Sequence, residues 1–111
     1  MRIGVTAKGT TLDSPVETRF GRCPYVIVVE GDTTGMEILP NPYAGESGGS
    51  GSRLVSLIAS HRVNVVLTGW PGPNAFAALE AAGIRIVKGC SGTVRQALDA
   101  FLGAGPGAGT G

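Results

Sequence analysis

The two cysteines of this chain are the residues whose side chains are best suited to bind a metal ion. Cys23 stands in the run Phe-Gly-Arg-Cys-Pro-Tyr at residues 20–25, and Cys90 stands in Gly-Cys-Ser-Gly at residues 89–92. A neighbouring cation favours the thiolate, which is the form of cysteine that ligates metals. Both residues are therefore candidate metal ligands, and the competing interpretation of each is a small buried hydrophobic residue. Two cysteines are too few for a four-cysteine zinc site, and because they do not form a C-x-x-C pair, the motif of thioredoxin-like redox chemistry is missing.

Basic residues and glycines indicate that the same loops could bind an anion. The run Gly-Trp-Pro-Gly-Pro-Asn at residues 69–74 is a rigid, low-profile approach to a helix N-terminus, which suits an anionic ligand. Trp70 would form a wall of that site or contact a partner protein. The alternative is that Trp70 has no binding role and covers part of the core as a partly buried side chain. The loops that we expect at one edge of the sheet hold six basic and three acidic residues: Lys8, Arg19, Arg22, Arg53, Lys88 and Arg95, against Asp13, Glu17 and Glu46.

The residues that an enzyme would need are missing from those loops. His61 is the only histidine, and its place at the end of a predicted helix puts it at the far edge of the sheet, where it would interact with the helix dipole. There is no nucleophile elbow. Carboxylates are absent from residues 2–6 and 63–68, so two-metal phosphoryl chemistry is disfavoured. We expect a protein that is not an enzyme.

The elements that must position these residues follow from hydrophobic periodicity. The patterns predict strands at 3–6, 25–30, 36–39, 63–68 and 84–87, and helices that begin near residues 54, 73 and 94. This order predicts an α/β fold: a mixed five-stranded sheet, with the second strand antiparallel, and three helices packed on it. Residues 7–24, 40–52, 69–73 and 88–92 would then converge on one edge, and the turn 31–35 would lie at the other.

Composition bounds the class of protein. The chain has 111 residues, of which 42% are hydrophobic and 15% are charged, so we expect one domain over residues 1–102 and a flexible glycine-rich tail over residues 103–111. The net charge of +1 disfavours nucleic acid as a partner. No apolar stretch is long enough to span a membrane, and no secretory signal is visible, so a cytoplasmic location is the expectation.

Several segments resemble the motifs of one known family, in the same order along the sequence. They are residues 19–25, Asn41-Pro42 with 48–51, 66–69 with 72–75, 82–84, and Gly89 with 91–94. Over residues 1 to about 102 the sequence is similar to the dinitrogenase iron–molybdenum cofactor biosynthesis family, the NifX/NifB-type accessory domain. The resemblance implies a ribonuclease-H-like fold. It also implies binding of a metal–sulfur cluster, either an iron–molybdenum cofactor precursor or a non-covalently held molybdenum–copper sulfide.

The resemblance and the loop chemistry together predict a non-catalytic cluster carrier whose partner is a protein that donates or accepts the cluster. Cys23 and Cys90 are the predicted metal ligands. The predicted cofactor-binding residues are Arg19, Arg22, Cys23, Gly69, Trp70, Gly72, Asn74, Lys88, Cys90, Ser91 and Gly92. The alternative is a protein-interaction module of the same fold that has no bound cluster and contacts its partner through Trp70.

Overall fold

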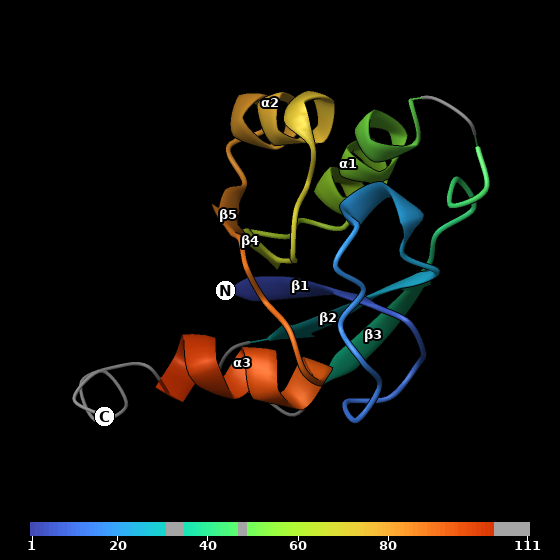
Figure 1. The fold of residues 1–111 in the computed structure, drawn as a ribbon. Coiled ribbons are helices and arrows are strands. Elements are labelled where there is room, and N and C mark those ends of the chain that lie inside the picture. The colour runs from blue at the N-terminus through green and yellow to red at the C-terminus, as the bar shows by residue number, and fades with distance from the viewer. Residues whose placement is uncertain (31–34, 47–48, 104–111) are drawn as a thin grey trace.

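The fold is a five-stranded mixed sheet with helices on both faces (Figure 1). The computed structural model describes residues 1–30, 35–46 and 49–103. The strand order is β3-β2-β1-β4-β5. The strands are β1 (Arg2–Ala7), β2 (Tyr25–Glu30), β3 (Met36–Pro40), β4 (Val65–Leu67) and β5 (Arg85–Val87). β2 is antiparallel to both of its neighbours, and β1, β4 and β5 are parallel, which confirms the predicted sheet.

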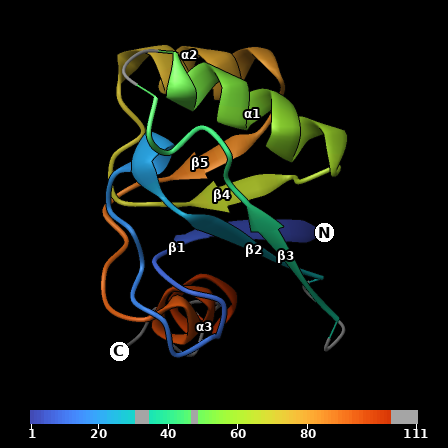
Figure 2. The ribbon, with the colours of Figure 1, turned by 90° about the vertical axis from the view of Figure 1, so that its right-hand side faces the viewer.

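Three helices and one short 3-10 turn complete the fold. They are η1 (Phe20–Arg22), α1 (Ser50–Ser60), α2 (Pro73–Ala81) and α3 (Val94–Gly103). α1 and α2 cover one face of the sheet, and α3 lies against the other (Figure 2). No helix of the described part of the chain is long and apolar enough to cross a membrane.

The alternation of side chains along the strands builds a core on each face. On β2, Val26 and Val28 pack toward α1 and α2, whereas Ile27 packs toward α3. On β4, Val66 faces the first pair of helices, and its two neighbours face α3. Successive side chains of a strand point to opposite faces, so a strand that is covered on both faces must be apolar throughout.

Several boundaries differ from the expectation. β4 covers only Val65–Leu67 rather than residues 63–68. α1 begins at Ser50 rather than near residue 54, because residues 50–53 wind into its first turn after Gly49, whose φ is 72°. Gly103 belongs to α3 rather than to a tail, and residues 104–111 lie outside the described residues. Most of the predicted turn at 31–35 and part of the 40–52 loop also fall outside them.

Four of the five strands, β1, β3, β4 and β5, run in the same direction. They end at one edge of the sheet, which we call the carboxyl edge. The register places Ala7, Tyr25 and Pro40 side by side there, and Leu67 and Val87 end the other two strands. The described connecting segments 8–24, 41–46, 68–72 and 88–93 therefore meet at this edge, as expected. Ligands of open α/β sheets bind in such a position.

His61 lies at the opposite edge, as expected. Its Nδ1 is 3.3 Å from Glu37 Oε2, and its carbonyl accepts a hydrogen bond of 2.8 Å from Arg2 Nε. Arg2 also pairs with Glu30 and Glu37. His61 thus lies in a polar cluster with Arg2, Glu30 and Glu37 that ties the end of α1 to the edge of the sheet, far from the converging loops.

Candidate functional site

A cavity of about 300 Å³ opens at the carboxyl edge where α1, α2 and η1 meet. Two glycines and one alanine, Gly21, Gly51 and Ala75, allow these elements to approach closely. A Cβ on Gly21 would lie 2.9 Å from Ser50 Oγ, and a Cβ on Gly51 would lie 3.0 Å from Ala75 Cβ. Larger side chains would push the elements apart, so the small residues keep backbone atoms at the cavity wall.

The two helices that begin at this cavity have no side-chain caps. The N-cap residues are Gly49 for α1 and Gly72 for α2, neither of which makes a side-chain capping bond, and neither first turn holds an acidic residue. Within the described residues, no acceptor takes the N–H groups of Asn74 and Ala75. The partial positive charge of each helix end is therefore available to an anion.

The N-terminus of α3 differs from those of α1 and α2, because it has side-chain and backbone partners within the chain. Thr93 Oγ1 accepts the N–H of Gln96 at 3.0 Å, and Gln96 Oε1 accepts the N–H of Thr93 at 2.9 Å, so the two residues form a capping box. The N–H groups of Val94 and Arg95 donate to the carbonyls of Ser14 and Leu12. This helix end is satisfied by the chain itself, and it lies on the other face of the sheet.

The two arginines of the predicted site have different roles. Arg19 lines the cavity with a side chain that is 73% exposed, and its Nε lies 3.5 Å from Glu17 Oε2. Glu17 is buried, and the same oxygen accepts the N–H of Arg19 at 3.0 Å. Arg22 also lines the cavity, but its Nη1 donates to the carbonyls of Ala44 and Glu46. Arg22 therefore holds the segment after β3, whereas Arg19 is oriented at the cavity mouth.

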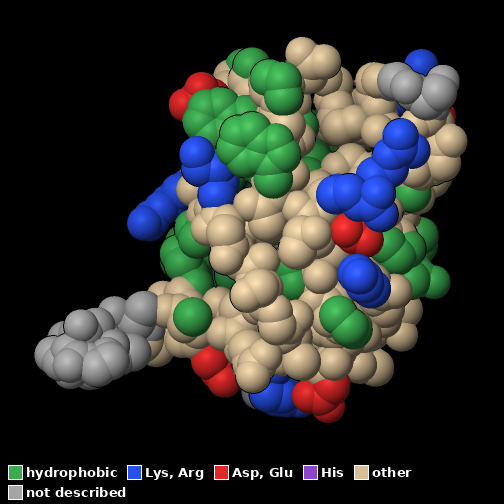
Figure 3. Space-filling model, in the orientation of Figure 1, with side chains coloured by type: hydrophobic (Ala, Val, Ile, Leu, Met, Phe, Trp, Pro, Cys, Tyr) green, Lys and Arg blue, Asp and Glu red, His purple; other side chains and the backbone are tan. Residues whose placement is uncertain are grey.

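Trp70 forms a further part of the cavity wall, and Lys88 lies next to it. The Lys88 ammonium is 5.5 Å from the centre of the Trp70 ring and 5.3 Å from that of Phe76. Trp70 is 57% exposed. Figure 3 shows hydrophobic side chains gathered beside basic ones over α2.

Cys23 does not line the cavity. Its side chain is fully buried in the core beneath α1 and α2, because η1 folds over the sheet and turns it inward. Burial raises the pKa of the Cys23 thiol to about 12, and the charge of Glu17 adds to this effect although a hydrogen bond from Asn41 opposes it. The thiol is therefore protonated at neutral pH and shielded from solvent.

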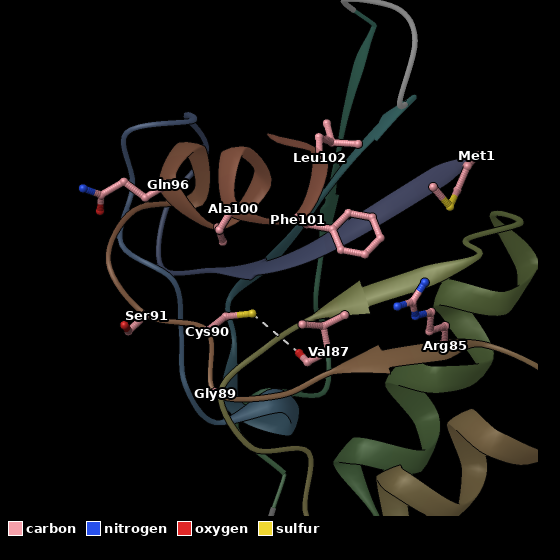
Figure 4. A pocket seen from close by; sticks show the side chains of 11 residues that line it. Met1, Arg85, Val87, Gly89, Cys90, Ser91, Gln96, Ala100, Phe101 and Leu102 are labelled. Atoms are coloured by element: carbon pink, nitrogen blue, oxygen red, sulfur yellow. Dashed lines mark hydrogen bonds between the residues drawn. The ribbon is translucent and has the colours of Figure 1, made fainter. Parts of the chain in front are cut away.

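Cys90 lies on the other face of the sheet. Its Sγ is 3.5 Å from the carbonyl of Val87, and burial raises the pKa of the thiol. It lines a second cavity, of about 820 Å³, between β5 and α3, together with Ser91 and apolar residues such as Phe101 (Figure 4). Cys23 and Cys90, the two predicted metal ligands, therefore do not face a common crevice: Cys23 is in the core beneath α1 and α2, and Cys90 is on the opposite face of the sheet.

The structure thus gathers only part of the predicted set. Arg19, Arg22, Trp70, Gly72 and Asn74 line the first cavity. Gly69 lies beside it, where a Cβ would come within 2.6 Å of the Thr18 backbone, and Gly92 belongs to the turn before α3. The described residues contain no group of three histidine, cysteine or acidic side chains that could hold a metal ion.

Sequence reasoning missed the contribution of residues 49–51 and of Glu17. The run Gly-Ser-Gly-Ser at residues 49–52 was the signal for the first of these, because it directly precedes the apolar helical pattern and fits a helix with a glycine N-cap. For Glu17 there was no signal, because its burial depends on contacts with Thr6, which donates to the Glu17 carbonyl at 2.7 Å.

The fold is shared with solved structures of the same size. It superimposes on the apo form of the orange protein from Desulfovibrio gigas with a TM-score of 0.89 and 41% identity, covering 93% of this chain and 88% of that one. A NifB-type protein from Thermotoga matches with a TM-score of 0.80 and 33% identity, covering 90% of this chain and 85% of that one.

The sequence comparisons agree with the structural ones. An uncharacterized protein from Methanocaldococcus jannaschii is 30% identical over 86 residues, which cover 75% of this chain and 73% of that protein. The family model described as dinitrogenase iron-molybdenum cofactor matches residues 1–104. That match spans every helix and strand described above, and the chain belongs to the dinitrogenase iron–molybdenum cofactor family.

Proposed function

We propose that the protein binds an anionic metal–sulfur cluster non-covalently, as cargo, in the cavity between the N-termini of α1 and α2. The observation that carries the proposal is the convergence of two uncapped helix ends and the oriented Arg19 on that cavity. Membership of a family of cofactor accessory proteins supports a metal–sulfur cluster as the anion. The candidates are a molybdenum–copper sulfide and an iron–molybdenum cofactor precursor.

Backbone N–H groups and one guanidinium suit a sulfur-rich anion. Hydrogen bonds to a charged group contribute about 1.5–3 kcal/mol each where water is excluded, and a helix N-terminus adds about 0.3–1 kcal/mol for a nearby negative charge. Neither thiol lines the cavity, so the proposal requires no bond between a cysteine and the metal.

The lining of the cavity supports a binding role rather than catalysis. Among the described residues that form it, the only ionisable side chains are those of Arg19 and Arg22. A general acid or base with a pKa near neutrality is therefore not part of the wall. In this proposal the chain binds the cluster and transfers it to another protein.

The test is reconstitution of the apoprotein with tetrathiomolybdate and Cu(I), or with iron and sulfide, followed by visible absorption and metal analysis. We expect Arg19→Ala to weaken uptake about tenfold, the lower end of the value for a charge-assisted hydrogen bond. Arg95→Ala is the matched control, because Arg95 is also exposed and paired with a carboxylate, Asp13 at 3.1 Å, but lies at the start of α3. It should bind within twofold of the wild type.

Three further outcomes test the proposed non-covalent cluster binding. Uptake by the Cys23→Ala and Cys90→Ala variants should remain, and its loss in either variant would contradict non-covalent binding. Uptake should weaken from low salt to 1 M, where the Debye length falls to about 3 Å. Failure of the wild type to take up either cluster would favour the interaction module over the carrier.

A further inference from the structure

The rim of the cavity carries an exposed aromatic group on a rigid backbone. Trp70 is the single tryptophan, and its side chain is 57% exposed. Its main chain is held on both sides: the N–H donates to the Thr18 carbonyl at 2.6 Å, and the carbonyl accepts the N–H of Phe20 at 3.2 Å. Gly69 allows this close approach, since a Cβ there would lie 2.6 Å from Thr18. The indole is therefore presented to solvent by a fixed segment.

Lys88 and Phe76 extend this surface. The Lys88 ammonium lies 5.5 Å from the Trp70 ring centre and 5.3 Å from that of Phe76, so it interacts with both aromatic rings. Within the described residues no carboxylate pairs with Lys88. We call Trp70, Phe76, Lys88 and the neighbouring Arg19 the aromatic rim.

The charge of the aromatic rim indicates what it would contact. Arg19 lies beside Trp70 through a parallel bridge, and its carboxylate partner Glu17 is buried beneath it. The outward-facing charges of the rim are therefore the cations of Arg19 and Lys88, which are exposed. Tryptophan and arginine are the residues most often found at the energetic centre of protein interfaces, and complementary charge selects the partner.

We propose that the aromatic rim docks an acidic surface of a second protein, the one that delivers or receives the cluster. This inference rests on the proposed function, because Trp70 and Arg19 line the cluster cavity and a protein seated on the rim would cover its mouth. An interface that closes the cavity excludes water while the cargo moves. The rigid backbone of Trp70 lowers the entropy lost on docking.

The experiment uses the apoprotein, so that it does not depend on cluster uptake. A photo-crosslinking amino acid replaces Ala77, an exposed residue of α2 next to Phe76, so that all four side chains of the aromatic rim stay in place. The crosslinked protein from the native organism's extract is identified by mass spectrometry and purified. Its affinity for the unmodified apoprotein is then measured from Trp70 fluorescence and by calorimetry. The expected contact peptide contains Asp or Glu, and binding should weaken as salt rises.

Matched variants test the surface. We expect Trp70→Ala and Lys88→Glu each to weaken binding at least tenfold, as measured by calorimetry, and Lys88→Gln to reduce the salt dependence. Met36→Ala is the control, because Met36 is also an exposed hydrophobic side chain (45%) but lies on the edge strand β3, at the far end of the sheet. It should change the affinity by less than twofold.

Other outcomes overturn the inference. These are capture of a second copy of this chain, binding of vesicles of anionic lipid or of nucleic acid through Trp70, and a purified partner that binds Trp70→Ala as well as the wild type. If the wild type takes up the cluster but the rim binds no acidic protein, the docking inference fails and the carrier function stands. If the rim binds such a protein but no cluster is taken up, the carrier function fails.

Discussion

At the scale of single residues, burial rather than sequence neighbours decides the chemistry of the cysteines. Arg22 precedes Cys23 in the sequence, but its guanidinium contacts the carbonyls of Ala44 and Glu46. The thiol instead lies in an apolar core, and removal from water disfavours its charged form. A residue that resembles a metal ligand in the sequence is thus a packing residue in the fold.

The buried thiol predicts how stability changes at alkaline pH. The pKa of Cys23 is raised from 9.0 to about 12 in the folded protein, so above pH 9 the unfolded state has lost a proton that the folded state retains. Stability should therefore be constant with respect to this group below pH 9 and should fall as the pH rises from about 9 to about 12. Urea unfolding at several pH values measures this slope.

The Cys23→Ala variant is the control for that slope. It should unfold at lower urea than the wild type at pH 7, because a buried side chain is truncated, but its stability should decrease less steeply between pH 9 and 12. Identical slopes would contradict the assignment, and Cys90→Ala should leave most of the slope in place because Cys90 is only partly buried.

At the scale of elements, the three helices begin in two different ways. α3 begins with a capping box and with two carbonyls from the segment after β1, whereas α1 and α2 begin at bare glycines. Relative to a serine, threonine, aspartate or asparagine cap, each glycine N-cap forgoes a few tenths of a kcal/mol, roughly 0.3 kcal/mol. The two helices with this cost are the two that meet at the cavity, which is consistent with a ligand taking the place of the cap.

A pair of substitutions at Thr93 tests the capping box. Thr93→Ser keeps the hydroxyl that accepts the N–H of Gln96 and should leave the free energy of unfolding within about 0.5 kcal/mol of the wild type. Thr93→Val keeps the shape but loses the acceptor and should cost about 1 kcal/mol. Chemical denaturation compares them. Equal stability of the two variants would show that the side-chain cap is dispensable.

At the scale of the whole molecule, the sheet is covered unequally. Two helices cover one face, and α3 alone covers the other, where the second cavity opens beside β5. β1 is the centre of the sheet, paired with β2 on one side and with β4 on the other. β3 and β5 form its edges.

This arrangement predicts the order of amide hydrogen exchange. The amides of β1 should exchange slowest, because β1 is hydrogen-bonded on both sides and its residues 3–7 are buried. Those of β5 should exchange faster, since this strand is short and at an edge. Exchange measured by NMR or mass spectrometry checks the order. Slower exchange in β5 than in β1 would contradict the topology.

The sequence by itself determined the sheet, its direction and much of the cavity wall. Continuous apolar runs at 25–30 and 63–68 predicted strands buried on both faces. The hairpin made β3 parallel to β1, and the two crossovers made β4 and β5 parallel to β3, so the loops that hold Arg19, Trp70 and Gly72 were placed at one edge. These properties depend on local periodicity and chain connectivity, which a sequence states directly.

Only the tertiary structure decided which side of the sheet each loop residue occupies. The connecting segments at the carboxyl edge have no strict period, so nothing local placed Cys23 in the core and Cys90 across the sheet. The satisfaction of the α3 N-terminus depends on the carbonyls of Leu12 and Ser14, which are about eighty residues away in the chain. Burial and hydrogen-bond satisfaction of loop residues are set by such distant contacts, and they determined which of the candidate groups line the site.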